Sequence, residues 1–238
     1  MAASTVNESQ DRQGRAALAY DRLRELIVHG QLAPGSRIIE TELAQRLGVS
    51  RTPIRSALQR LQQEGFIRGG RAGQRSRTSV APLTRQDARE LFEIVGSLEG
   101  LAATHAARLP PGKRTQLVQR LNAANEKLHQ LERMTNPDRA RFFDLDSDFH
   151  RIYVEAGSSH RLSHLHDSVK PQAERYIRLY VSVLTGEIGT SVKEHRKIIE
   201  AIQIGAPDRA KDFVFQNWRN AAERLKRVID SVGERGSW

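Results

Sequence analysis

From residue 85 to residue 232 the apolar residues recur every three or four positions, and no alternating pattern typical of strands persists. The clearest stretch places Leu117, Leu121, Ala124, Leu128 and Leu131 at intervals of four, three, four and three. This is the period of one buried helix face. We therefore predict an antiparallel all-α bundle of six helices, at about 85–108, 112–133, 137–156, 161–184, 190–204 and 208–232.

The first helix of this bundle carries large side chains along one side, namely Leu91, Ile94, Leu98, Leu101 and His105. Aromatic residues make up only 5% of the chain, so the core must consist mostly of Leu, Ile, Val and Ala. That composition favours helices over sheets.

The residues before 83 follow a different plan. Helices are predicted at 16–29, 41–47 and 51–63, and short β segments at 66–67 and 78–80 flank a glycine-rich, arginine-rich loop. We therefore predict a mainly α chain with three parts: a disordered tail (1–15), a winged helix-turn-helix (16–82) and the helical bundle (83–238).

Charge and composition limit the partners of this chain. The net charge is +10, and residues 1–82 hold thirteen Arg and no Lys against seven acidic residues. A basic excess attracts nucleic acid or an anionic membrane, although a merely basic surface would give the same numbers. The chain has no cysteine, which excludes disulfides and Cys-ligated zinc, and it has no apolar run long enough to span a bilayer. We expect a cytoplasmic protein.

The segment Thr41–Gln63 has the parts of a helix-turn-helix, with Gly48-Val49-Ser50 as the turn and Ser50 suited to be an N-cap. The first residues of the second helix enter the major groove in such a motif, and here they are Arg51, Thr52 and Arg55. Arginine can donate two parallel hydrogen bonds to guanine. The alternative is an ordinary helical hairpin with a solvated basic face.

The stretch "GVSRTPIRSAL", followed by "LQQEGFI", resembles the winged helix of the GntR family of bacterial regulators. The resemblance covers about residues 16–82. It implies operator contacts at Ser50, Arg51, Thr52 and Arg55. Thr41 stands where some members have a phosphate-binding arginine. The wing, with Arg71, Arg75 and Arg77, would reach the DNA backbone or the minor groove.

A second cluster of chemistry-bearing residues lies in the bundle. Asp146 and His150 are four residues apart and share a helix face, and His195 lies among apolar residues of its own helix. The three could converge on a divalent ion such as zinc, nickel or manganese. The alternative is that His195 is a satisfied core histidine and that Asp146 pairs locally.

The stretches "FFDLDSDFHRIYVEAGSS" and "EHRKIIEAIQIGAPDRAKDF" resemble the FCD effector domain of the FadR subfamily, over about residues 84–232. The resemblance implies metal binding through Asp146, His150 and His195. The expected third histidine falls at Asn217, whose amide oxygen is a weaker ligand. It also implies a homodimer that binds double-stranded operator DNA and a small-molecule effector such as an organic acid, usually as a repressor released by its ligand.

Many members anchor the effector with an arginine four residues before Glu99, where this chain has Val95. Arg175 and Arg178 could substitute for that arginine, or they could face solvent. We expect His160, His164 and His166 to lie on the surface.

Two other functions compete with that of a regulator. An Asp-His-His metal site could activate water in an enzyme, but no further acid or base stands at motif spacing. A DNA-packaging protein would need phosphate contacts without a base-reading helix, and its affinities for specific and bulk DNA would be similar. We therefore predict a regulator and not an enzyme.

Overall fold

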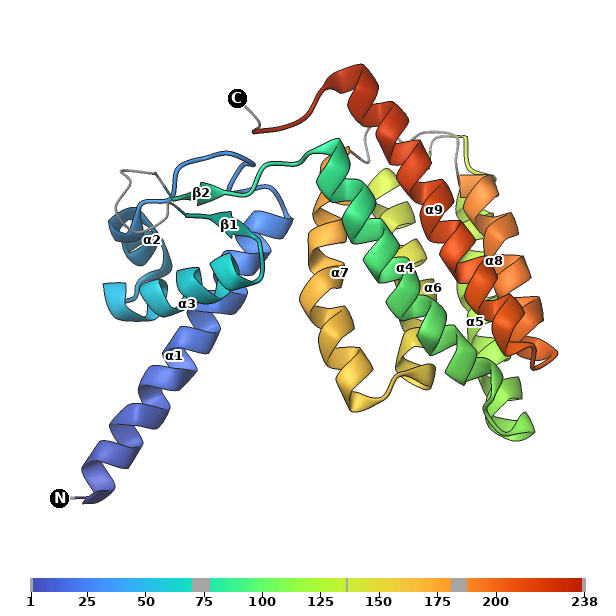
Figure 1. Cartoon of the computed structure of the whole chain (residues 1–238), viewed down its shortest axis with the longest axis horizontal. Helices are drawn as coiled ribbons and strands as arrows, with labels where there is room; N and C mark the ends of the chain where they lie inside the picture. Colours follow the sequence, from blue (N-terminus) through green and yellow to red (C-terminus); the bar gives the residue numbers. More distant parts are fainter. Residues whose placement is uncertain (1, 70–77, 136, 181–187, 237–238) are drawn as a thin grey trace. The chain divides into compact units, whose positions relative to one another are not determined.

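The computed structural model describes residues 2–69, 78–135, 137–180 and 188–236. Helices dominate the described part of the chain, and the only sheet in it is a two-stranded one. In chain order the elements are α1 (Ala2–Val28), α2 (Glu40–Leu47), α3 (Arg51–Gln63), β1 (Ile67–Arg68), β2 (Ser79–Val80), α4 (Arg85–Ala107), α5 (Pro111–Glu132), α6 (Arg139–Gly157), α7 (His160–Tyr180), α8 (Ile188–Gln203) and α9 (Pro207–Val232) (Figure 1).

The chain divides into two compact units. The first comprises Met1–Thr84 together with Glu234–Trp238, and the second comprises Arg85–Gly233. The boundary near 82 that the sequence predicts thus lies two residues from the observed one. The last residues differ from the expectation, because they join the first unit instead of the bundle.

The first unit is a winged helix-turn-helix. Its core is formed by apolar side chains of α1, α2, α3 and the wing: Leu23, Ile27, Leu43, Ile54, Leu61, Phe66 and Val80. Gly48 has a φ of 64°, which lets the chain turn sharply between α2 and α3. The antiparallel strands pair Ile67 with Val80 and Arg68 with Ser79. The predicted order of helix, turn, helix and wing is confirmed.

Two local expectations in this unit differ from the structure. Ser50 occupies the N-cap position of α3 with an extended backbone, but its side chain makes no capping hydrogen bond. Residues 1–15 were expected to be a disordered tail, whereas α1 begins at Ala2. The segment has no proline and a single glycine, Gly14, so nothing in it forces the helix to end.

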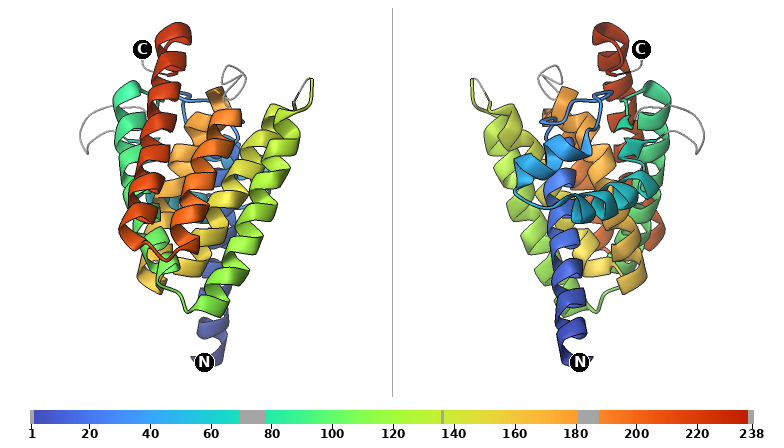
Figure 2. Two further views of the ribbon diagram at one scale, coloured as in Figure 1. Left: turned by 90° about the vertical axis from the view of Figure 1, so that its right-hand side faces the viewer. Right: turned by 90° about the vertical axis from the view of Figure 1, so that its left-hand side faces the viewer.

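The second unit is the predicted bundle of six helices. Helix α4 packs against α9, α6 and α7, while α5 packs against α6 and α8 (Figures 1 and 2). The residues expected to be buried on α5, Leu117 to Leu131 in the four-three pattern, are all buried. Among the described residues, no helix is both long and apolar enough to cross a membrane.

Helix α4 packs against α9 through Phe92 and through small residues that let the two helices approach closely. A Cβ added to Gly96 would lie 2.9 Å from Cβ of Trp218, and one added to Gly100 would lie 3.3 Å from Cγ of Lys211. Because α9 approaches α4 on the side of these glycines, part of the face that the large residues predict to be buried is exposed to solvent. Ile94 is 47% exposed and Leu101 is 44% exposed, although Leu91 is buried.

Candidate functional site

The start of α3 presents its polar side chains to solvent. Ser50, Arg51, Thr52 and Arg55 are exposed, as is Thr41 in the first turn of α2. The side chains of Arg51 and Arg55 are 56% and 62% exposed. Both guanidinium groups are therefore accessible to a duplex. The predicted wing residues Arg71, Arg75 and Arg77 lie outside the described residues.

An acidic residue, which the sequence analysis did not single out, holds the two arginines. The Arg55 Nε donates to Oε2 of Glu40 at 2.8 Å, and the Arg51 Nη2 donates to the same oxygen at 3.4 Å. The hydrogen bond from Arg55 lowers the pKa of Glu40 below its ordinary value. Glu40 thus stays ionised and competes with any anion for the two guanidinium groups.

The bundle brings together the three residues predicted as metal ligands. Asp146 and His150 from α6 and His195 from α8 have ligand atoms that all lie within 4.8 Å of one another. His195 is fully buried and His150 nearly so, while the Asp146 side chain is 26% exposed. Two imidazoles and a carboxylate at this spacing form a set of ligands that suits a divalent metal ion.

The hydrogen bonds of His150 determine which ring nitrogen faces the cluster. Its Nδ1 lies 2.7 Å from Oε2 of Glu99 and 2.7 Å from the hydroxyl of Tyr153, and both oxygens can accept a hydrogen bond. Nδ1 therefore donates to these oxygens, and Nε2 is the ring nitrogen that lies toward Asp146, 3.9 Å from Oδ2. A carboxylate behind a histidine is the usual support of a metal-bound imidazole.

His195 is oriented in the same way by an amide. Asn125 Nδ2 donates to the Val192 carbonyl at 3.2 Å, so Asn125 Oδ1 faces Nδ1 of His195, also at 3.2 Å, and accepts its proton. Phe149 stacks on the imidazole at 3.7 Å. Burial holds the pKa of His195 well below its ordinary value, so the ring is neutral.

The Nε2 atom of His195 is buried and has no hydrogen-bond partner. It lies 3.5 Å from Oδ1 of Asp146. Burial raises the pKa of Asp146, and the nearby positive charges of Lys170 and Arg224 oppose this effect only in part. Two imidazole nitrogens and a carboxylate that face one another in a buried site are an arrangement that a bound cation would stabilise.

Glu99 is fully buried beside this cluster and accepts hydrogen bonds from five residues on three helices. The donors are His150 and Tyr153 from α6, His166 and Lys170 from α7, and Trp218 from α9. Burial alone would raise the pKa of Glu99, but the charge of Lys170 and the hydrogen bonds of the imidazoles hold it well below its ordinary value.

The position of His166 corrects the prediction that it lies on the surface, because its ring is buried against Glu99. His166 and Lys170 are four residues apart on α7, a spacing that places them on one face. The spacing of His166 and Lys170 could have indicated that both face the interior. The neighbouring His160 and His164 instead suggested that the whole segment is polar and exposed.

Asn217, predicted as the fourth metal ligand, is buried on α9, and its Nδ2 donates to Oε2 of Glu194 at 2.7 Å. Asn220 and Arg224 donate to the other oxygen of the same carboxylate. The described contacts of Asn217 thus engage its amide nitrogen and not the amide oxygen that would bind a metal.

The two arginines predicted to bind the effector contact other groups. Arg175 points inward, and burial lowers its pKa to about 10, while the charge of Asp87 acts in the opposite direction. Arg178 donates to Asp144 at 3.5 Å and stacks over Phe143 at 4.1 Å. Glu99, the third predicted effector residue, has its oxygens engaged by the five donors named above.

Comparisons with known proteins agree with this architecture. Residues 15–75 match the model of the bacterial regulatory proteins of the gntR family, and residues 90–219 match that of the FCD domain. The HTH-type transcriptional regulator YdhC of Bacillus subtilis is 28% identical over 90% of this chain and 92% of its own length. The HTH-type transcriptional repressor RspR of Escherichia coli is 24% identical over 88% of each chain.

A similar fold has been solved by crystallography. A transcriptional regulator of the GntR type from Rhodococcus superposes with a TM-score of 0.63, covering 89% of this chain and 97% of its own, at 21% identity. The likeness extends over both units.

The contact of Glu40 with both arginines generates a prediction. Glu40→Gln should bind random-sequence DNA several-fold more tightly, because it removes a negative charge beside the phosphates and frees two cations. Fluorescence anisotropy over a salt series measures this. Glu42→Gln, which makes the same charge change at an exposed position on α2, is the matched control. Equal effects of the two substitutions would mean that net charge alone matters.

Proposed function

We propose that this chain, which belongs to the GntR family of bacterial regulatory proteins and carries an FCD domain, is a repressor. It represses transcription until a small-molecule effector releases it from its operator. It is a DNA-binding transcriptional regulator with a sensing domain, and its family is not one of enzymes. Repression is supported by the relative named as a repressor. Because the operator lies on chromosomal DNA, the proposal also places the protein in the cytoplasm.

The observation that carries the DNA-reading role is the exposure of Arg51 and Arg55 at the start of α3. The first residues of the second helix of a helix-turn-helix meet base edges in the major groove. We assign base reading to these arginines and to Thr52, and phosphate contact to Ser50, Thr41 and the wing arginines Arg71, Arg75 and Arg77.

A single substitution tests the assignment of Arg55. Arg55→Ala should cost about 1–3 kcal/mol on an operator selected from a random DNA pool and relax the preference at one base position. Its effect on random DNA should be much smaller. Arg120→Ala, which removes an exposed charge from the bundle, controls for net charge. A parent protein with similar affinity for the selected operator and for bulk DNA would instead indicate a DNA-packaging protein.

We further propose that Asp146, His150 and His195 hold a divalent metal ion, with zinc, nickel and manganese as candidates. The strongest support is the buried Nε2 of His195, which has no hydrogen-bond partner, together with the two hydrogen bonds that fix both imidazoles with Nε2 toward Asp146. A bound ion would offer open coordination positions to an oxygen donor of the effector, such as a carboxylate.

The effector itself is proposed to be a small organic acid bound beside this ion. Glu99 contributes by supporting His150, and not by direct contact with the effector, because its oxygens are already engaged. The charges of Lys170 and Arg224 act on Asp146, so we propose these two residues as the groups that attract an anion there, although each also pairs with a carboxylate, Glu99 and Glu194 respectively.

Asn217→His tests whether residue 217 faces the metal, as the family resemblance implies. The variant should bind Zn²⁺ roughly tenfold more tightly or better, because imidazole is a stronger ligand than an amide oxygen. Titration calorimetry measures the affinity. Asn220→His is the matched control, since Asn220 also donates to Glu194 but lies about one turn away. Retention of full Zn²⁺ affinity in His195→Ala would contradict the site itself.

The homodimer is proposed to form through the apolar strip of α4 that contains Ile94 and Leu101. The two residues are seven apart, so they lie on one face, and a two-fold dimer would present two recognition helices to two half-sites. Leu101→Glu should then sediment as a monomer. Ile204→Glu, at an even more exposed apolar position, should not change the sedimentation coefficient. A dimeric Leu101→Glu variant would exclude this strip as the interface.

A further inference from the structure

The chain does not end with the bundle. After Val232 it continues into residues Glu234–Gly236, which we call the C-terminal strap. The amide of Leu83 donates to the Arg235 carbonyl at 2.8 Å, and the amide of Arg235 donates to the Leu83 carbonyl at 3.1 Å. The two residues form an antiparallel bridge within the first unit. The strap therefore pairs with the last residues of the DNA-binding unit.

A contact between two glycines holds the end of the strap. Gly236 and Gly35 have φ values of 76° and 75°, in the left-handed region that favours glycine. A Cβ added to Gly35 would lie 2.6 Å from Cα of Gly236, and one added to Gly236 would lie 2.6 Å from the carbonyl oxygen of Pro34. Backbone thus packs directly on backbone, and any side chain at either position would separate the two segments.

The strap gives the molecule a second covalent link between its units. The first link is the peptide bond between Thr84 and Arg85, and the second is that between Gly233 and Glu234. Within the bundle the two links start close together, because the Arg85 Nη1 donates to Oδ1 of Asp230 at 2.8 Å. The hydroxyl of Tyr180 donates to the Gly233 carbonyl at 3.1 Å and fixes the end of α9 to α7.

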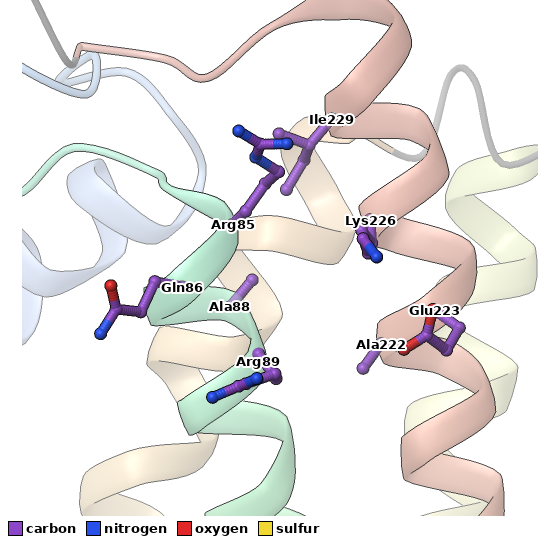
Figure 3. Close-up of a pocket in the computed structure, with 8 residues that line it drawn as sticks. All are labelled: Arg85, Gln86, Ala88, Arg89, Ala222, Glu223, Lys226 and Ile229. Carbon is purple, nitrogen blue, oxygen red and sulfur yellow. The ribbon is translucent and has the colours of Figure 1, made fainter.

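The ends of α4 and α9 that carry these links are less closely packed than the middle of the two helices. A cleft of about 520 Å³ lies between them, lined by Arg85, Ala88, Arg89, Ala222, Lys226 and Ile229 (Figure 3). Farther along, Gly96 lets α4 lie directly against Trp218 of α9. The link-bearing ends therefore have room to shift relative to each other.

The same two helices reach the sensing cluster. Glu99 belongs to α4 and Trp218 to α9, and the Trp218 Nε1 donates to Oε2 of Glu99 at 2.8 Å. A change around Glu99 thus acts on both helices. The start of α4 carries the first link, and the end of α9 carries the second. A displacement of one link against the other turns the attached unit, whereas a single flexible link would transmit no torque.

We propose that the C-terminal strap is a second mechanical connection, through which a shift of α9 relative to α4 is passed to the DNA-binding unit. The proposal rests on the regulatory role of the chain, but it does not require that the metal site be real. In the free protein the docked strap should restrict the range of orientations between the units. Its loss should widen that range even when no metal is added.

The absence of cysteine allows a direct test with spin labels. Arg22→Cys on α1 and Lys127→Cys on α5, both at exposed positions, place one label on each unit. Double electron–electron resonance then gives the distribution of distances between the labels, measured in excess unlabelled protein to suppress signals between partners in a dimer. The strap is removed by Gly236→Ala or by ending the chain after Gly233. Gly112→Ala, where an added Cβ meets nothing, is the matched control.

The distance distribution should broaden roughly twofold in both strap variants, as expected for a unit held by one flexible link, and should not change in Gly112→Ala. Hydrogen exchange of the Leu83 amide, roughly tenfold faster in Gly236→Ala, verifies that the substitution undocks the strap. A truncated chain that keeps the width of the parent distribution would overturn the proposal. If a separate titration shows that the parent protein does not bind zinc, the proposed metal site is wrong, but the comparison of distance distributions still tests the strap.

Discussion

The bundle depends on one buried charge, the carboxylate of Glu99. Leaving an ionised group in a protein interior without partners costs several kcal/mol, so the five donors around Glu99 must be held in place by the fold. They come from α6, α7 and α9, while Glu99 itself comes from α4. One carboxylate therefore requires four helices to keep their relative positions, and this requirement fixes the geometry of the neighbouring Asp-His-His cluster.

The indole of Trp218 can reach Glu99 because α4 has no side chain at Gly96, where α9 crosses it. Gly96 allows the backbone of α9 to approach until the indole of Trp218 reaches the carboxylate, and Lys170 then lies 4.3 Å from the centre of the indole ring. A larger residue at position 96 would push Trp218 outward and remove one donor from Glu99. Packing and electrostatics are thus linked at this crossing, because small side chains in the interface make room for polar ones.

The sequence predicts the parts of this architecture that local patterns encode. The helical period places the six helices of the bundle, and the turn at Gly48 predicts the helix-turn-helix. The helix face shared by Asp146 and His150 follows from their spacing, whereas the convergence of His195 on them is what the resemblance to the FCD domain implies. The arginines at the start of α3 are exposed, as a DNA-reading role requires.

What the sequence does not predict depends on contacts between distant segments. The burial of His166 depends on Glu99, which is 67 residues away along the chain, and nothing near His166 indicates that partner. The exposed side of α4 is determined by the glycines that admit α9, whereas counting large residues places the exposed Ile94 and Leu101 on the buried side. The pairing of Arg235 with Leu83 has no pattern at all, because backbone atoms make it and two glycines permit it. Helix α9 thus connects Glu99, which receives donors from three helices, to the strap that follows α9, and this connection depends on packing between segments distant in the chain.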